Sequence, residues 1–239
     1  MHNRVPVCLR CLEAPKPFSA EVFCPRCRMA FSEAEHLGEG GECELCASGV
    51  TQFAAAYSYG FYEDELRGLI LLLKYGGIRT LAPRMGAWLA DALPRDRRFD
   101  AIVPVPLHWW RQLRRGFNQS ELLAAELGRR TGLPVRAGAM KRERATPKQS
   151  LLDNAGRQAN VAGAFRVERP AEVAGRRILL LDDVLTTGAT LNACAAALKK
   201  AGASHVSALT LARVDHRVPA TFESAVPAPS GSPNAGATA

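Results

Sequence analysis

The string ILLLDDVLTTGAT, at residues 178–190, constrains the fold of this chain more than any other feature. It opens with a short continuous apolar run, which is typical of a buried strand in a parallel sheet. Asp182 and Asp183 follow where that strand is expected to end, and the carboxyl ends of strands are where open α/β sheets bind ligands. A glycine-bearing loop and a helical pattern come next. The string therefore predicts a strand–loop–helix unit with a ligand site at its loop.

The residue types after the two aspartates indicate an anion site. Gly188 allows a tight turn, and small neighbours let a phosphate approach the main-chain amides. A helix starting at about Ala189 would point its N-terminal amides and the positive end of its dipole at the anion. The hydroxyls of Thr186, Thr187 and Thr190 can add further donors.

The two carboxylates need a separate explanation, because acids beside a phosphate would repel it. Asp182 and Asp183 can accept hydrogen bonds from ribose hydroxyls, which lie one sugar away from a 5-phosphate. They can also help to hold a Mg²⁺ that neutralises a pyrophosphate, directly or through water. The spacing therefore predicts a site for a ribose 5-phosphate, with hydroxyl acceptors at one end and anion donors at the other.

Strand-like and helix-like segments alternate through the rest of the chain, which predicts an α/β fold with a mostly parallel sheet flanked by helices. Asn118 is expected to cap a helix that ends at Gly132. Residues 142–160 are polar and basic, and are expected to form a mobile loop with a short helix. Strands are expected at residues 53–62, 100–104, 134–141, 177–181 and 205–212, and further helices at 64–75, 84–93 and 189–201.

Charge and hydropathy limit the class of protein. The net charge is +8, and residues 1–50 carry five Lys/Arg against seven Asp/Glu, so the rest of the chain carries a net +10. A basic surface suits a polyanion such as a phosphorylated metabolite or a nucleic acid. We expect no membrane span, because no run of 18 apolar residues occurs, and the N-terminus lacks the apolar core of a secretory signal. A cytoplasmic location is the expectation.

Six of the seven cysteines form three CxxC pairs, at Cys8–Cys11, Cys24–Cys27 and Cys43–Cys46. Two such pairs complete a tetrahedral Zn²⁺ shell, so three pairs supply more thiolates than one site needs. The spacing alone slightly favours the second and third pairs. Residues 1–50 have no sustained helical or strand period, so a bound metal is expected to stabilise them.

The chain also resembles a known family. ILLLDDVLTTGAT matches the signature of type I phosphoribosyltransferases at every fixed position, which implies their fold and phosphoribosyl pyrophosphate as the ligand. With Pro104–Val105–Pro106, RRGFNQ at residues 114–119 and R-x-T-x-x-Q at residues 144–149, the chain is similar to the competence protein F (ComF) family. The resemblance covers roughly residues 5–215.

The resemblance implies three segments and a metal site. Residues 1–50 would be a CxxC zinc-binding module, residues 51–215 a phosphoribosyltransferase-like domain, and residues 216–239, rich in Pro, Ala, Ser and Gly, a disordered tail. It favours the first two cysteine pairs for a structural Zn²⁺, with these ligands: Cys8, Cys11, Cys24 and Cys27. The pair Cys43–Cys46 would then be a remnant without metal.

Further site residues follow from the resemblance. The ligand phosphoribosyl pyrophosphate, with Mg²⁺, would be bound by Asp182, Asp183, Thr186, Thr187, Gly188, Ala189, Thr190, Pro104, Val105, Pro106, Arg115 and Lys74. Arg144 would act with the two aspartates in catalysis, on a basic loop that closes over the pyrophosphate.

The implied setting is natural competence and DNA uptake, with single-stranded DNA and other competence proteins as candidate partners. Trp109 and Trp110 could stack bases, or could pack beneath the loop that precedes them. The alternative is an active phosphoribosyltransferase of nucleotide or nucleoside metabolism with an unknown acceptor.

Overall fold

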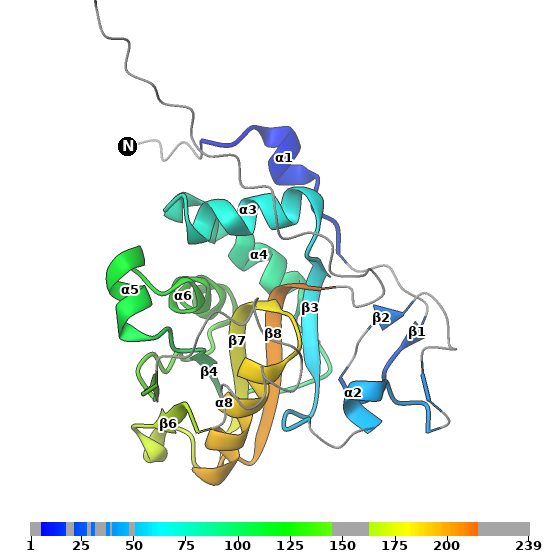
Figure 1. Ribbon diagram of the computed structural model, residues 1–239, viewed down its shortest axis with the longest axis vertical. Coiled ribbons are helices and arrows are strands. Elements are labelled where there is room, and N and C mark those ends of the chain that lie inside the picture. Colours follow the sequence, from blue (N-terminus) through cyan, green and yellow to red (C-terminus); the bar gives the residue numbers. More distant parts are fainter. Residues whose placement is uncertain are drawn as a thin grey trace, which may run out of the picture.

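The centre of the molecule is a four-stranded parallel sheet. The computed structural model describes residues 6–17, 22–27, 30–31, 37–38, 40–47, 51–144 and 163–214. The strand order is β3-β8-β7-β4, and every neighbouring pair is parallel. Figure 1 shows the strands side by side with helices packed around them. Their bounds are Ala56–Phe61 for β3, Ala101–Pro104 for β4, Arg177–Leu185 for β7 and His205–Arg213 for β8. The parallel α/β fold expected from the sequence is confirmed.

Helices cover both faces of this sheet, because successive residues of the central strand point to opposite sides. Leu179 and Leu181 of β7 face one buried cluster, and Ile178 and Leu180 face the other. The first cluster lies under α3 (Asp64–Lys74), α4 (Ala82–Ala92) and α6 (Gln119–Thr131). The second lies under α8 (Ala189–Lys200). Short 3₁₀ turns occur at Arg79–Leu81 and Pro170–Glu172.

Helix α6 begins and ends where the sequence predicts. The side chain of Asn118 accepts a hydrogen bond from the Ser120 amide, and Gly132 ends the helix in the left-handed conformation. The same arrangement bounds α5 (Trp109–Arg115), a helix that was not predicted. There, His108 accepts from the amide of Trp110, and Gly116 has a positive φ. Hydropathy periodicity could not predict α5, because its sequence, WWRQLRR, has no apolar face that repeats over several turns.

Two strands differ from expectation. Strand β7 continues to Leu185 rather than ending at Leu181, because β8 runs beside it and supplies partners for its last residues. Residues 134–141 do not form a continuous strand. Val135 makes an isolated parallel bridge with Ile102, and β5 (Met140–Arg142) then pairs with β6 (Phe165–Val167) in a separate antiparallel ribbon.

The cysteine-bearing part of the chain packs against the sheet. It contains α1 (Leu9–Glu13), β1 (Val22–Phe23), β2 (Ala30–Phe31) and α2 (Glu44–Ala47). In Figure 1, α1 lies beside α3, whereas β1, β2 and α2 lie on the β3 side of the sheet. Four cysteines of this part belong to the same buried cluster as α8: Cys24, Cys27, Cys43 and Cys46. These cysteines therefore share a core with the sheet.

Two expected segments cannot be compared with the structure. The tail at residues 216–239 and most of the basic loop at 142–160 lie outside the described residues. Within the described part of the chain, no helix has the length and apolar character needed to cross a membrane.

The close contact between α4 and α6 depends on a glycine. A Cβ on Gly86 would lie 2.6 Å from the Cβ of Glu126, whereas a Cβ on Gly68, in α3, would meet nothing within 4 Å. We expect Gly86→Ala to lower the free energy of unfolding by about 1–3 kcal/mol through overpacking. Gly68→Ala is the matched control, and should raise it by about 0.5–1 kcal/mol through helix propensity. Urea unfolding of both variants tests this, and equal effects would contradict it.

Candidate functional site

Two adjacent carboxylates stand at the carboxyl end of the sheet. Asp182 and Asp183 are neighbours near the end of β7, so their side chains leave the strand on opposite sides. Asp183 is buried, and Asp182 is partly exposed. The two aspartates lie within β7 rather than directly after it, because the strand runs two residues past Asp183.

Lys74, at the end of α3, pairs with the second carboxylate. Its Nζ lies 2.9 Å from Oδ1 of Asp183, and both side chains are largely shielded from water. Burial alone would lower the pKa of Lys74, but the charge of Asp183, the hydrogen bond to it and the charges of Tyr62 and Asp182 together raise it. The other carboxylate oxygen of Asp183, Oδ2, is buried and has no hydrogen-bond partner among the described residues. One oxygen is therefore neutralised by the protein, and the other is available to a donor from a ligand.

The first carboxylate is held by α6. Oδ1 of Asp182 accepts a hydrogen bond of 2.8 Å from the hydroxyl of Ser120 and one of 2.9 Å from the amide of Asp183. Burial and the charge of Asp183 nevertheless raise the pKa of Asp182 to about 7, against the lowering effects of Lys74 and Ser120. Asp182 can therefore change its protonation state near neutral pH.

The Pro104–Val105–Pro106 loop leaves the sheet beside these carboxylates. Strand β4 pairs with β7 so that Pro104 lies opposite Leu181, and the amide of Val105 donates to the Leu181 carbonyl over 2.8 Å. The side-chain amide of Asn118 donates to the carbonyl of Val105 over 3.1 Å. The RRGFNQS segment thus makes two contacts. Asn118 fixes the Pro104–Val105–Pro106 loop, and Ser120 fixes the carboxylate of Asp182. Sequence reasoning recognised Asn118 only as a helix cap and missed its second contact.

The phosphate end of the predicted site is formed by the turn between β7 and α8. Gly188 takes a left-handed conformation (φ 77°), and α8 begins at the next residue. The hydroxyl of Thr187 is buried and has no hydrogen-bond partner among the described residues. Thr186 is exposed and Thr190 is half-buried. The turn therefore has the form that the sequence predicts for an anion site.

The two predicted arginines, Arg115 and Arg144, lie in different surroundings. Arg115 donates to the side chain of Gln119, and its guanidinium lies 5.3 Å from the ring centroid of Tyr75. Arg144 is exposed at the last described position before residue 163. Its neighbour on β5, Arg142, is buried and lies 5.2 Å from the Phe165 ring centroid. Burial and the charge of Arg111 lower the pKa of Arg142, and the charges of Cys194 and Asp182 act in the opposite direction.

A small pocket adjoins the Pro104–Val105–Pro106 loop. Its volume is about 140 Å³, and its walls come from the loop, α5, α6 and β5. Trp109 and Leu107 supply apolar surface, and Glu121 and Gln112 supply hydrogen-bonding groups. Trp109 and Trp110 are 63% and 57% exposed, which excludes packing of either side chain beneath the loop.

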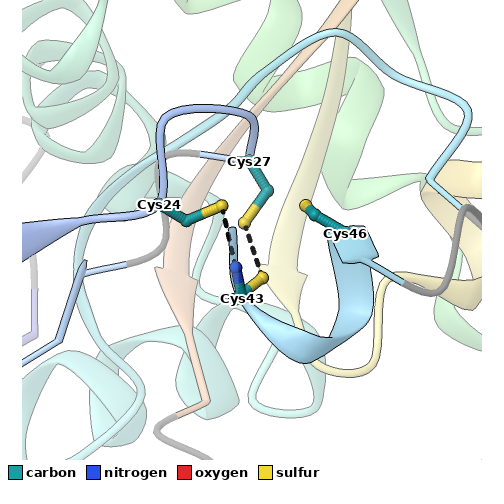
Figure 2. A group of neighbouring side chains, drawn as sticks. All are labelled: Cys24, Cys27, Cys43 and Cys46. Carbon is teal, nitrogen blue, oxygen red and sulfur yellow. Dashed lines mark hydrogen bonds between the residues drawn. The ribbon is translucent and has the colours of Figure 1, made fainter. Parts of the chain in front are cut away.

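Four cysteines form a separate cluster on the α8 face of the sheet. Cys24 and Cys27 follow β1, and Cys43 and Cys46 lie at α2. Figure 2 shows the four sulfur atoms turned toward one another, and all of them lie within 4.8 Å. The amide of Cys43 donates to Sγ of Cys24, and the hydroxyl of Thr51 donates to Sγ of Cys46. Four buried thiols at this spacing could hold a metal ion such as zinc.

This grouping differs from the one that the family resemblance implied. Cys24 and Cys27 lie with Cys43 and Cys46, whereas Cys8 and Cys11 lie at α1 and take no part in the cluster. The pair expected to be a remnant is therefore half of the four-thiol site. The spacing of the second and third pairs was the better guide.

A buried arginine adjoins the thiols. Arg213, the last residue of β8, is 1% exposed. Burial lowers its pKa, and the thiols of Cys27 and Cys43 act in the opposite direction, partly through a hydrogen bond to Cys27. A cation at this position would balance part of the negative charge that four thiolates bring to a divalent metal. No sequence pattern marked Arg213, because its role depends on the pairing of β8 with the rest of the sheet.

Comparison with known proteins shows the family to which the chain belongs. Competence protein F of Haemophilus influenzae is 32% identical over 215 residues, which cover 87% of this chain and 90% of that protein. The chain belongs to the competence protein F (ComF) family. DNA utilization protein YhgH of Escherichia coli is 32% identical over 213 residues and is covered to 90%. Competence protein ComFC of Bacillus subtilis is 36% identical over 158 residues, 64% of this chain and 61% of that protein.

The ComF match agrees with a second comparison. The model of the phosphoribosyl transferase domain matches residues 113–225, which include the RRGFNQS segment and the DDVLTTGAT turn. This ComF protein is therefore a phosphoribosyltransferase-like parallel sheet flanked by helices, with a four-cysteine cluster near its N-terminus.

The Lys74–Asp183 pair yields a stability prediction. Lys74→Met leaves Asp183 buried without its cation, and should lower the free energy of unfolding at pH 8 by about 3–5 kcal/mol. Urea unfolding at pH 8 measures this loss. The double variant Lys74→Met/Asp183→Asn is the control and should recover most of the loss; no recovery would show that Lys74 acts through its packing.

Proposed function

We propose that this ComF-family protein binds phosphoribosyl pyrophosphate at the DDVLTTGAT turn and acts in DNA uptake. One observation carries the ligand assignment. Oδ2 of Asp183, near the end of β7, and the hydroxyl of Thr187, in the turn before α8, are buried and have no hydrogen-bond partner among the described residues. Buried polar atoms normally have hydrogen-bond partners, so unsatisfied atoms at such a turn favour a polar ligand.

The two ends suit different parts of this ligand. The carboxylates of Asp182 and Asp183 would accept hydrogen bonds from the ribose hydroxyls. The amides that follow Gly188 would donate to the 5-phosphate, together with the hydroxyl of Thr187. The loop at Val105 stands beside the carboxylates, at the place where the pyrophosphate would leave the sugar. Mg²⁺ bound with the ligand would neutralise the pyrophosphate, and the carboxylate oxygens are suitable ligands for it or for its waters.

The role in DNA uptake rests on the relatives and on the surface of α5. The relatives carry the names competence protein and DNA utilization protein. Trp109 and Trp110 are exposed in the same short helix as Arg111 and Arg114. Exposed aromatic rings among arginines suit the stacking of single-stranded bases beside a neutralised backbone. The expected setting is the cytoplasm, with other competence proteins as partners.

Calorimetric titration with phosphoribosyl pyrophosphate and Mg²⁺ tests the ligand. Asp182→Asn and Asp183→Asn should each lower affinity about 10- to 100-fold, because each removes a charged hydrogen-bond acceptor. The control is Asp96→Asn, which removes one charge from an exposed position paired only with the neighbouring Arg97 among the described residues. Unchanged affinity in both site variants would overturn the assignment.

The same titration has a pH dependence. The pKa of Asp182 is raised to about 7, and the ribose needs the ionised carboxylate. A proton must therefore leave when the ligand binds below pH 7, so affinity should rise by up to about tenfold per pH unit up to 7 and level off above it. Titration of the ligand's own phosphates is common to all variants. The part of the pH dependence of affinity that is lost in Asp182→Asn therefore reports the titration of Asp182.

We also propose that the four-cysteine cluster holds a structural Zn²⁺. Four thiolates complete a tetrahedral shell, which leaves no open position for a substrate. The buried Arg213 and the hydroxyl of Thr51 would serve as a charge partner and a hydrogen-bond donor to the thiolates.

Metal analysis of cysteine variants tests this site. Cys43→Ser should lose most of its bound zinc, because a serine hydroxyl is a poor replacement for a thiolate. Cys8→Ser should keep one zinc per chain, since Cys8 lies outside the cluster. Loss of zinc from Cys8→Ser alone would restore the ligand set expected from the family resemblance.

The second candidate function is an active phosphoribosyltransferase with an unidentified acceptor. The pocket beside Pro106 favours it, because a cavity of about 150 Å³ is large enough for benzene, and this one is about 140 Å³ with Trp109 as a wall. Release of pyrophosphate should be measured with nucleobases, amines and DNA ends as acceptors. Turnover that Asp182→Asn abolishes would establish the enzyme, and binding without release would leave the ligand-binding role.

A further inference from the structure

The first CxxC pair stands apart from the metal-binding cysteines. Val7 and Leu12, which flank the pair, pack against the buried cluster beneath α3, α4 and α6. The four-cysteine cluster belongs to the opposite, α8 face of the sheet. Tyr59 of β3 donates a hydrogen bond of 3.0 Å to the carbonyl of Pro15, which anchors the segment after α1. Cys8 and Cys11 therefore cannot join the cluster without detaching α1 from its face of the sheet.

The two thiols of this pair lie next to each other. Cys8 is the extended residue that precedes α1, and Cys11 lies in the first turn of that helix, so both sulfurs emerge on one side. They share a hydrogen bond. Cys8 is exposed and Cys11 is partly buried. The arrangement thus presents one sulfur to solvent with a second behind it.

The surroundings shift the pKa values of the two thiols in opposite directions. Hydrogen bonds from the backbone and thiol of Cys11 lower the pKa of Cys8, and the charge of Arg10 adds to this effect. The hydrogen bond to Cys8 raises the pKa of Cys11, as do partial burial and the charge of Glu65 at the start of α3. An accessible thiolate beside a protonated thiol is the arrangement of a dithiol that exchanges with disulfides.

We propose that Cys8 and Cys11 are a redox-active dithiol, which small-molecule disulfides oxidise to an intramolecular disulfide. The four buried cysteines remain reduced in the same reaction. The pair would give this protein a modification site that responds to the thiol–disulfide balance independently of its metal.

The reaction takes place in two exchanges. The thiolate of Cys8 attacks one sulfur of the small disulfide RSSR, forms a mixed disulfide and releases RS⁻, which takes up a proton. The Cys11 thiol then loses its proton and attacks Sγ of Cys8, forming the Cys8–Cys11 bond and releasing the second RSH. Two protein thiols are oxidised by two electrons, and one RSSR is reduced to two RSH.

Thiol trapping on the full-length, metal-loaded protein tests the proposal. The protein is equilibrated in buffers of varied glutathione to glutathione disulfide ratio, quenched with acid, alkylated and digested for mass spectrometry. We expect Cys8 and Cys11 to lose alkylation together over a single transition, and their peptide to become lighter by two hydrogens. The metal content and the protection of Cys43 should stay constant.

Single substitutions separate the roles of the two thiols. Cys11→Ser should accumulate the glutathione mixed disulfide at Cys8, because the resolving thiol is absent. Cys8→Ser should react with glutathione disulfide about tenfold more slowly than Cys11→Ser, because its remaining thiol is less ionised and less accessible. Cys194, which is fully buried, provides an internal control that should stay unlabelled in the folded protein.

Two outcomes would overturn the proposal. Full alkylation of Cys8 and Cys11 at every glutathione ratio would show that the pair does not form a disulfide. Loss of zinc from Cys8→Ser, or protection of Cys8 that ends only when a chelator removes metal, would make the pair a metal ligand instead. Neither outcome bears on phosphoribosyl pyrophosphate binding, which is measured separately.

Discussion

The parallel pairing of β7 with β4 on one side and β8 on the other is the constraint on which the rest of the structure depends. It places Pro104 opposite Leu181, so the loop after β4 and the carboxylates after Leu181 emerge at the same edge. Helices α3 and α6 then bring Lys74 to Asp183 and Ser120 to Asp182. Because the groups of the site come from β7, the loop after β4, α3 and α6, the geometry depends on the sheet and its helices rather than on the turn alone.

The cysteine cluster is connected to the same framework. The amide of Gln52 donates a hydrogen bond of 2.9 Å to the side chain of Asn192, one turn into α8, and the neighbouring Thr51 donates to Cys46. Metal bound by the four thiols would therefore brace residues that contact the helix whose first turn forms the anion site. This connection gives a physical reason for a metal centre beside a phosphoribosyltransferase-like sheet. A bound metal would replace the apolar core that so short a segment cannot form alone.

Much of this arrangement could be predicted from the sequence, because it depends on local patterns. The alternation of apolar runs and helical periods predicted the parallel sheet, and Asn118 and Gly132 marked both ends of α6. What could not be predicted depends on contacts between distant segments. The partnership of Lys74 with Asp183, the second contact of Asn118 and the burial of Arg213 all join elements that only the folded chain brings together. The cysteine grouping shows the same limit, since the spacing of the three pairs only slightly favoured the two that meet in the folded chain.

The position of β3 has a consequence for folding during synthesis of the chain on the ribosome. Among the described strands, this one lies at the edge of the sheet and pairs with β8 alone, with Ala56 opposite Ala208. The ribosome releases β3 and the cysteines long before it releases the strand that covers them. During that interval the thiols lack Arg213, and β3 presents an unpaired edge to other chains. Completion of the core must wait for almost the last described residues, so a truncated product would expose both the clustered cysteines and the first strand of the parallel sheet.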